Sequence, residues 1–283
     1  FDDSGQRARE RVVVSSGANT ILYTGPPLGF GDPPTSFVLR RTHNPKSTAM
    51  EVSRAYVVVP SRKLSSLNHT YRKSSGGKHI PVIDARSSRL NLLTSKLDDG
   101  DRDYNRFRKV IHTSEEVLKL PGSQSIEVNF DKKLVLSAYR IHNSKRLVRR
   151  GQKIKVSLFF RVMGRVLKNY KIFVHIESPG ADRIGADFWV LNLPGGADDK
   201  QCRGCFQTNH WMVGDVVEAT FEKEVPFGSK SGRYDLWFGF YMSSGDQGRL
   251  QALGLAGPVT ESSDRSGAHT RLLGLEHLLE QFQ

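Results

Sequence analysis

The sequence contains no run of about 18 apolar residues, the minimum for a membrane-spanning helix, so we expect no transmembrane segment. It also lacks a nucleophile elbow, a His-Glu-x-x-His zinc motif, a Walker loop and a Gly-x-Gly-x-x-Gly that follows a predicted strand. The glycine-rich stretch at 25–31 is interrupted by prolines, which remove backbone N–H groups that a phosphate loop needs. These absences favour a protein that is not an enzyme and that carries no cofactor.

Cysteine is scarce: Cys202 and Cys205 are the only two in the chain. A redox Cys-x-x-Cys normally opens a helix in a thioredoxin-like unit, whereas this pair lies in a loop between predicted strands. A zinc site needs four ligands, and only His210 is close in sequence, with His175 as a further candidate. Haem attachment requires a histidine where Phe206 stands. We favour a local disulfide, which predicts an oxidising compartment, and the zinc and redox interpretations remain alternatives.

Acidic residues are outnumbered: 29 Asp and Glu face 42 Lys and Arg, which gives a net charge of +13. The basic residues concentrate at 54–109 and 140–171 rather than in a tail, so we expect a basic face on a folded body. Its partners would be other protein subunits, or alternatively a glycan or an anionic polymer. We rank nucleic acid below these because neither a recognition helix nor an aromatic platform is clear. The candidate anion-binding residues are Arg146, Arg149, Arg150 and Lys153.

One segment departs from this basic character. Asp99, Asp101 and Asp103 alternate around Gly100, in a pattern similar to the first half of a calcium loop. The glutamate expected at the end of such a loop is missing, so these aspartates are weak metal candidates. The alternative is a solvated turn whose carboxylates cap a helix that begins near Tyr104. We predict no metal site.

Alternation of apolar and polar residues dominates the stretch from Lys133 to Ala252, as in half-buried antiparallel strands. Even-numbered positions at 154–160 share one face, and so do those at 234–240, whereas Trp237, Gly239 and Tyr241 share the other face of that strand. Only one of the latter two faces is expected to be core. The pattern predicts a mostly β protein: an antiparallel β-sandwich, immunoglobulin- or carbohydrate-binding-module-like, with an irregular, strand-containing N-terminal region and short helices.

We divide the chain into an extended arm with a Pro/Gly-rich loop at 1–35, a small β-rich region at 36–122, the sandwich at 123–276 and a tail at 277–283. Two apolar runs at 12–14 and 21–23, separated by a turn, suggest a hairpin or an edge strand. The polar segment 61–78 is predicted to be a loop. Segment 105–120 is predicted to be helical, with a separate short helix capped by Ser114 as the alternative. Because Phe1 is neither Met nor followed by a signal-peptide core, we expect a processed chain or one that begins further upstream.

The order of motifs in the second half resembles the soluble β-sandwich domain at the C-terminal end of bacterial membrane glycosyltransferases of the mannosyltransferase type, and related envelope proteins. The motifs that carry this resemblance are Arg150-Gly151, Phe173-Val174-His175, Gly195-Gly196, Trp211-x-x-Gly214-Asp215, Val225-Pro226, and Gly232, Tyr234, Leu236, Gly239 and Tyr241. The Cys-x-x-Cys insert at 198–206 departs from the family pattern. The resemblance implies an accessory, carbohydrate-binding-like module with no catalytic residues.

From these observations we expect a non-enzymatic structural or interaction subunit of a bacterial extracytoplasmic assembly, located in the periplasm or at the cell surface. The first alternative is a carbohydrate-binding module, because exposed aromatic rings can lie flat against sugars. The second alternative is an accessory domain of a glycosyltransferase. The candidate glycan contacts are Trp189, His210 and Trp211.

Overall fold

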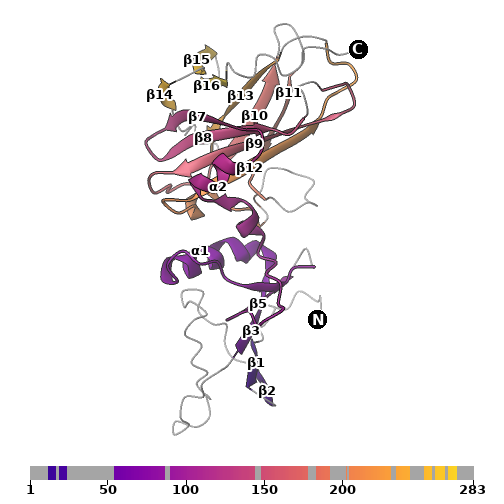
Figure 1. The fold of residues 1–283 in the computed structure, drawn as a ribbon, viewed down its shortest axis with the longest axis vertical. Helices are drawn as coiled ribbons and strands as arrows, with labels where there is room; N and C mark the ends of the chain where they lie inside the picture. Colours follow the sequence, from indigo (N-terminus) through magenta and orange to yellow (C-terminus); the bar gives the residue numbers. More distant parts are fainter. Residues whose placement is uncertain are drawn as a thin grey trace. The chain divides into compact units, whose positions relative to one another are not determined.

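The computed structural model is mostly strand, arranged in antiparallel sheets with a few short helices (Figure 1). It describes residues 12–16, 19–23, 54–86, 90–143, 148–177, 183–191, 202, 204–230, 234–242, 252–256, 259–264 and 267–272. Of 12–23, 54–58 and 252–272 only the backbone is described.

The chain divides into two compact units, residues 1–108 and 109–283. The boundary lies earlier than the 122/123 junction expected from the sequence, because residues 109–122 add a strand and a helix to the second unit.

Unit 1 contains a five-stranded antiparallel sheet in the order β2-β1-β3-β5-β4. Its strands are β1 (Val12–Ser16), β2 (Asn19–Tyr23), β3 (Arg54–Pro60), β4 (Val82–Asp84) and β5 (Leu90–Thr94). The runs at 12–14 and 21–23 form the β1–β2 hairpin, one of the two alternatives offered by the sequence, and β1 also pairs with β3. Residues 12–16 and 19–23 are therefore strands of a sheet.

The prediction of a loop at 61–78 is wrong, because η2 (Ser61–Lys63) and helix α1 (Leu64–Ser74) occupy most of it. The buried face of α1 has regular helical spacing but is largely polar: it consists of Leu64, Ser65, Asn68, Tyr71 and Arg72. The polar members are compensated by partners distant in sequence. The Asn68 carboxamide accepts a hydrogen bond from Ile80 N (3.2 Å) and another from Asn105 Nδ2 (3.0 Å). A pattern based on hydropathy does not detect such a face.

Unit 2 contains two antiparallel sheets. The first, in the order β14-β7-β8-β9-β12-β6, is built from β6 (Ile111–His112), β7 (Ser123–Phe130), β8 (Leu134–Ile141), β9 (Lys153–Val162), β12 (Val216–Glu224) and β14 (Ala252–Ala256). The second, in the order β11-β10-β13-β16-β15, is built from β10 (Lys171–Glu177), β11 (Ile184–Phe188), β13 (Asp235–Tyr241), β15 (Val259–Asp264) and β16 (Gly267–Leu272).

Aromatic side chains connect the two sheets. Phe240 of β13 lies 5.2 Å from Phe130 of β7 and 4.8 Å from Phe160 of β9, measured between ring centroids. Phe238 and Trp211 contact the same group. The alternation read from the sequence is confirmed: all four even-numbered residues of 154–160, and all four of 234–240, are buried. This cluster is the core of unit 2.

Helix α2 (Ser114–Lys119) covers part of the opposite face of the first sheet, where Val117 packs against Ala138, Phe159 and Val216. The continuous helix expected at 105–120 does not form. Instead η3 (Arg106–Lys109) and strand β6 precede α2, as the alternative of a separate short helix anticipated. Its cap is Thr113 rather than Ser114, in a capping box with Glu116.

The C-terminal part of the predicted sandwich contributes strands to both sheets of unit 2, β14 to the first and β15 and β16 to the second. The tail at 277–283 lies outside the described residues.

Gly239 on β13 provides a test of the packing in the second sheet. A Cβ at this position would lie 2.6 Å from the buried ring of Phe173, whereas a Cβ on Gly228 would meet nothing within 4 Å. We expect Gly239→Ala to lower the free energy of unfolding of unit 2 by about 1–3 kcal/mol through overpacking. Gly228→Ala should have little effect. Urea titration followed by tryptophan fluorescence reports on unit 2 alone, because Trp189, Trp211 and Trp237 all belong to it. If Gly239→Ala and Gly228→Ala lowered the free energy of unfolding equally, the packing of Phe173 against Gly239 would be contradicted.

Candidate functional site

An exposed phenylalanine, Phe227 in the turn after β12, lies against the turn that leads into β9. Phe227 is 76% exposed, and its ring lies over Gly151, so close that a Cβ on Gly151 would be 2.7 Å from Phe227 Cζ. Gly151 also has φ +77°, a conformation that L-residues with side chains rarely adopt. Two backbone hydrogen bonds join the segments: Gly151 N donates to Val225 O (2.8 Å), and Val225 N donates to Gln152 O (2.9 Å). The exposed ring is therefore held on a fixed backbone.

Basic residues adjoin Gly151 in the chain. Arg149 and Arg150 are exposed in the same turn, and Arg149 makes no ion pair within the described parts of the chain. Lys153 forms an ion pair with Glu222 (2.8 Å), which raises the pKa of the lysine and lowers that of the carboxyl. Its charge is thus partly compensated. Arg146, the fourth predicted anion-binding residue, lies outside the described residues. We call Arg149, Arg150 and Phe227 the arginine–phenylalanine corner.

A hydrogen-bonded network lies on the face of the first sheet that points away from the aromatic core. Glu218 of β12 contacts His112 of β6 (Oε2 to Nε2, 3.0 Å) and accepts from Ser157 of β9 (Oγ to Oε1, 2.6 Å) and Thr220 (3.1 Å). His142, which follows β8, lies 2.8 Å from Ser157 Oγ through its Nε2 atom. The network therefore connects side chains from four neighbouring segments.

The electrostatics of this network indicate what it can do. Burial opposes ionisation of Glu218, but hydrogen bonds from His112, Ser157 and Thr220 outweigh it and lower the pKa of Glu218 to about 2. Burial, together with Arg140 and Lys155, lowers the pKa of His142. Ser157 is fully buried and its hydroxyl donates to a carboxylate, so it is not placed to attack a substrate. The network stabilises the sheet rather than forming a nucleophilic centre.

A second polar group lies on the outer face of the other sheet. Asp187 of β11 lies 3.4 Å from His175 Nε2 and accepts a hydrogen bond from the Tyr241 hydroxyl (2.8 Å). The bond from His175 is the largest cause of the lowered pKa of Asp187, and burial opposes it. A Cβ on Gly185 would lie 2.6 Å from His175 Cδ2, so the imidazole packs over a glycine. His175 thus has structural contacts in the sheet.

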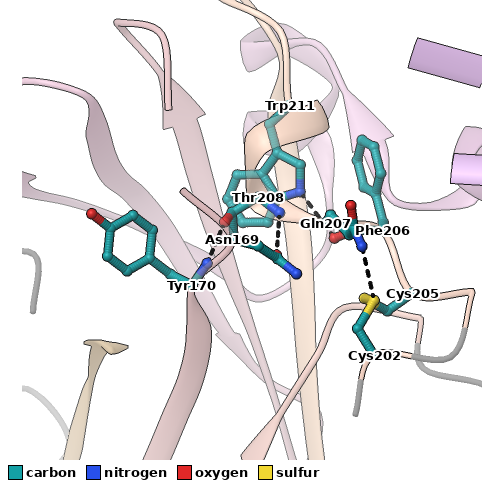
Figure 2. Close-up of a disulfide and its surroundings, with 8 residues drawn as sticks. All are labelled: Asn169, Tyr170, Cys202, Cys205, Phe206, Gln207, Thr208 and Trp211. Carbon is teal, nitrogen blue, oxygen red and sulfur yellow. Dashed lines mark hydrogen bonds between the residues drawn. A yellow bond between two sulfur atoms is a disulfide. The ribbon is translucent and has the colours of Figure 1, made fainter. Parts of the chain in front are cut away.

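The Cys-x-x-Cys insert is anchored in the core (Figure 2). Cys202 and Cys205 are joined as a disulfide, with their Cα atoms 5.4 Å apart. Thr208, three residues after Cys205, contacts residues 168–170: its Oγ1 accepts from Tyr170 N (2.7 Å; Figure 2) and donates to Lys168 O (3.1 Å). Its backbone N–H donates to Asn169 Oδ1 (3.1 Å). These bonds fix the described segment 204–208 against residues 168–170.

The candidate glycan contacts are buried or half-buried. Trp211 is 3% exposed, stacks on Phe160 and donates its indole N–H to Phe206 O (3.3 Å). Trp189 is 6% exposed, and His210 is half-buried in η5 (Thr208–His210). Neither indole presents an open ring face, so their placement offers no surface for sugar stacking.

The acidic segment has a structural role in unit 1. Asp103 Oδ1 accepts from Val82 N (3.1 Å) and Asn105 N (2.8 Å), and Oδ2 pairs with Arg108 Nε at 2.5 Å. Asp99 is exposed, and Asp101 accepts from Asp98 N (3.0 Å). Across the described residues no group of three or more His, Cys, Asp or Glu is arranged to hold a metal ion.

Two features of unit 2 were missed by sequence reasoning. The network around Glu218 joins residues far apart in the chain, and no local motif marks it. Phe227 did carry a signal: a large apolar residue between Pro226 and Gly228, where a turn residue is expected to be polar.

Comparisons with known proteins add no family to this description. No protein-family model matches the chain, and no curated protein matches it either. In the part of the chain that the structure describes, no helix is long and apolar enough to cross a membrane.

The lowered pKa of Glu218 predicts that unit 2 becomes less stable at acid pH. Because the folded-state value (about 2) lies below the ordinary 4.5, the carboxylate stabilises unit 2 above pH 4.5. That contribution is lost as the pH falls from 4.5 towards 2. We expect Glu218→Gln to lower the free energy of unfolding by about 2 kcal/mol at pH 7 and by much less near pH 2. Urea titrations at several pH values measure this, with Glu224→Gln, at an exposed position of the same strand, as the control. If the free energies of unfolding of wild type and Glu218→Gln differed by the same amount at every pH in this range, the lowered pKa of Glu218 would be contradicted.

The disulfide is tested by alkylation. Iodoacetamide should leave the folded, unreduced chain unmodified and should label both cysteines after reduction and unfolding, as read by intact mass. Labelling before reduction would mean that the cysteines are thiols. A zinc site would instead show thiols that a chelator, rather than a reductant, makes reactive.

Proposed function

We propose that the chain is a non-enzymatic interaction module of a bacterial extracytoplasmic assembly, and that the arginine–phenylalanine corner binds an acidic segment of a partner protein. We further infer that the two sheets of unit 2 form a β-sandwich that serves as the scaffold. The observation that carries the proposal is Phe227, a large apolar side chain exposed at 76% and packed against Gly151, in the turn that also carries the exposed Arg149 and Arg150.

The chemistry of the corner favours a protein partner. Aromatic residues and arginine are the side chains most enriched where protein interfaces derive their affinity. Arg149 and Arg150 supply planar donors that bind carboxylates in a bidentate manner, and Phe227 supplies an apolar surface for a neighbouring side chain. The excess of positive charge over the whole chain would speed association with an acidic partner.

Two observations support the remaining parts of the proposal. The disulfide favours an oxidising compartment, in agreement with an extracytoplasmic location. In the only Ser–His–Glu group described above, Ser157 is buried and Glu218 stays ionised to about pH 2, which argues against acid–base or nucleophilic catalysis there. The resemblance to the accessory domain of membrane glycosyltransferases is compatible with a module of this kind.

Site-specific photo-crosslinking tests the corner. Phe227 is replaced by p-benzoylphenylalanine, and the full-length protein is irradiated in an envelope extract of the source cells. We expect a discrete, protease-sensitive adduct. Arg149→Glu with Arg150→Glu should weaken it by about tenfold, because opposite charges would become like charges.

The matched control carries the same photo-reactive residue at Leu118, which is also exposed but lies on α2. A specific partner at the corner would be ruled out if adducts formed equally at both positions, or if the Arg149→Glu and Arg150→Glu changes left the adduct yield unchanged. A protease-resistant adduct that stains for carbohydrate would instead support the carbohydrate-binding alternative.

A further inference from the structure

Three apolar side chains protrude at the end of the first sheet where β9 finishes. Met163 is 51% exposed, Leu167 is 70% exposed and Val213 is 64% exposed. Backbone hydrogen bonds bring their segments together: Met163 N donates to Lys133 O (2.8 Å), and Gly214 N donates to Val162 O (2.9 Å). We call the segments 131–133, 163–168 and 212–214 the apolar tip.

The same segments carry basic residues. Lys132, Arg165 and Lys168 are exposed and form no ion pair within the described ranges, and Lys133 pairs with Asp131 at 3.5 Å. The other carboxylate of the tip, Asp215, is buried and accepts from Met212 N (3.0 Å), closing the turn. The exposed charge of the tip is therefore strongly positive.

Contacts with the body of unit 2 hold the backbone of the tip in place. Val166 is buried whereas its neighbour Leu167 is exposed, so the loop has one residue anchored in the core and one directed outwards. Lys168 O accepts from Thr208 Oγ1, which links the loop to the segment that follows the disulfide. Exposing these apolar residues therefore requires no rearrangement of the backbone.

We propose that the apolar tip docks on an anionic phospholipid surface, with Met163, Leu167 and Val213 entering the interface between headgroups and acyl chains. Lys132, Arg165 and Lys168 then contact the headgroup phosphates, their aliphatic stems lying along the apolar part. Three exposed apolar side chains on segments that also carry exposed basic residues match the chemistry of such a surface. They are few for a stable protein–protein interface, which buries roughly 800 Å² on each partner. This surface is separate from the arginine–phenylalanine corner, and the proposal does not depend on the proposed function.

Vesicle flotation of the full-length protein tests the proposal. The wild type should float with vesicles that contain phosphatidylglycerol, more weakly at high salt, and should not float with vesicles of phosphatidylcholine alone. Replacing Met163, Leu167 and Val213 together by Ser should lower the partition coefficient at least about tenfold. Replacing Lys132, Arg165 and Lys168 together by Gln should lower it by a similar factor on anionic vesicles.

Control variants separate the tip from other exposed apolar residues. Leu118→Ser and Phe227→Ser remove comparable exposed side chains elsewhere and should leave flotation unchanged. Leu167→Trp should gain fluorescence that brominated lipids quench, whereas Leu118→Trp should not. Urea titration checks that every variant folds.

The proposal would be overturned if the wild type failed to float, if it bound neutral vesicles equally well, or if the tip variants bound as the wild type does. Because Phe227→Ser is expected to affect partner binding alone, failure at the tip and failure at the corner give different results.

Discussion

The aromatic contact between the two sheets is the interaction on which unit 2 depends. Phe240 reaches Phe130 and Phe160 across the sheet boundary, and Trp211 stacks behind Phe160. Burial of large aromatic side chains provides a strong driving force, and edge-to-face geometry restricts how the sheets align. Because this contact occupies the inner faces, the polar network around Glu218 and the group around Asp187 lie on the outer faces.

The two proposed surfaces lie at opposite ends of β9. The arginine–phenylalanine corner precedes Lys153, and the apolar tip follows Val162. A strand of ten residues spans about 33 Å, so one small ligand does not reach both surfaces. Taken together, the two proposals describe a module that binds a partner at one end of β9 and rests on a lipid surface at the other. In that arrangement the shared strand would set the distance between membrane and partner.

Sequence reasoning succeeded for strands in which buried and exposed residues alternate along the chain. The inward faces of β9 and β13 were read from alternation, because one face of a half-buried strand must be apolar. It failed at α1, whose buried face is mostly polar, since Asn68 meets its partners Ile80 and Asn105 only in the folded unit. It also failed to separate exposed from buried aromatic residues: Trp211 lies in the core and Phe227 at the surface.

The sequence by itself determined the chain's mostly β character, its basic charge and the chemistry available to it. Composition and local periodicity carry that information, because each depends on neighbouring residues alone. Only the tertiary structure decided which side chains meet. It joined His112, Ser157 and Glu218, placed Phe227 over Gly151, and brought Met163 beside Lys133. The physical reason is that these contacts depend on strand register and sheet packing, which arise from many weak interactions between residues far apart in the chain.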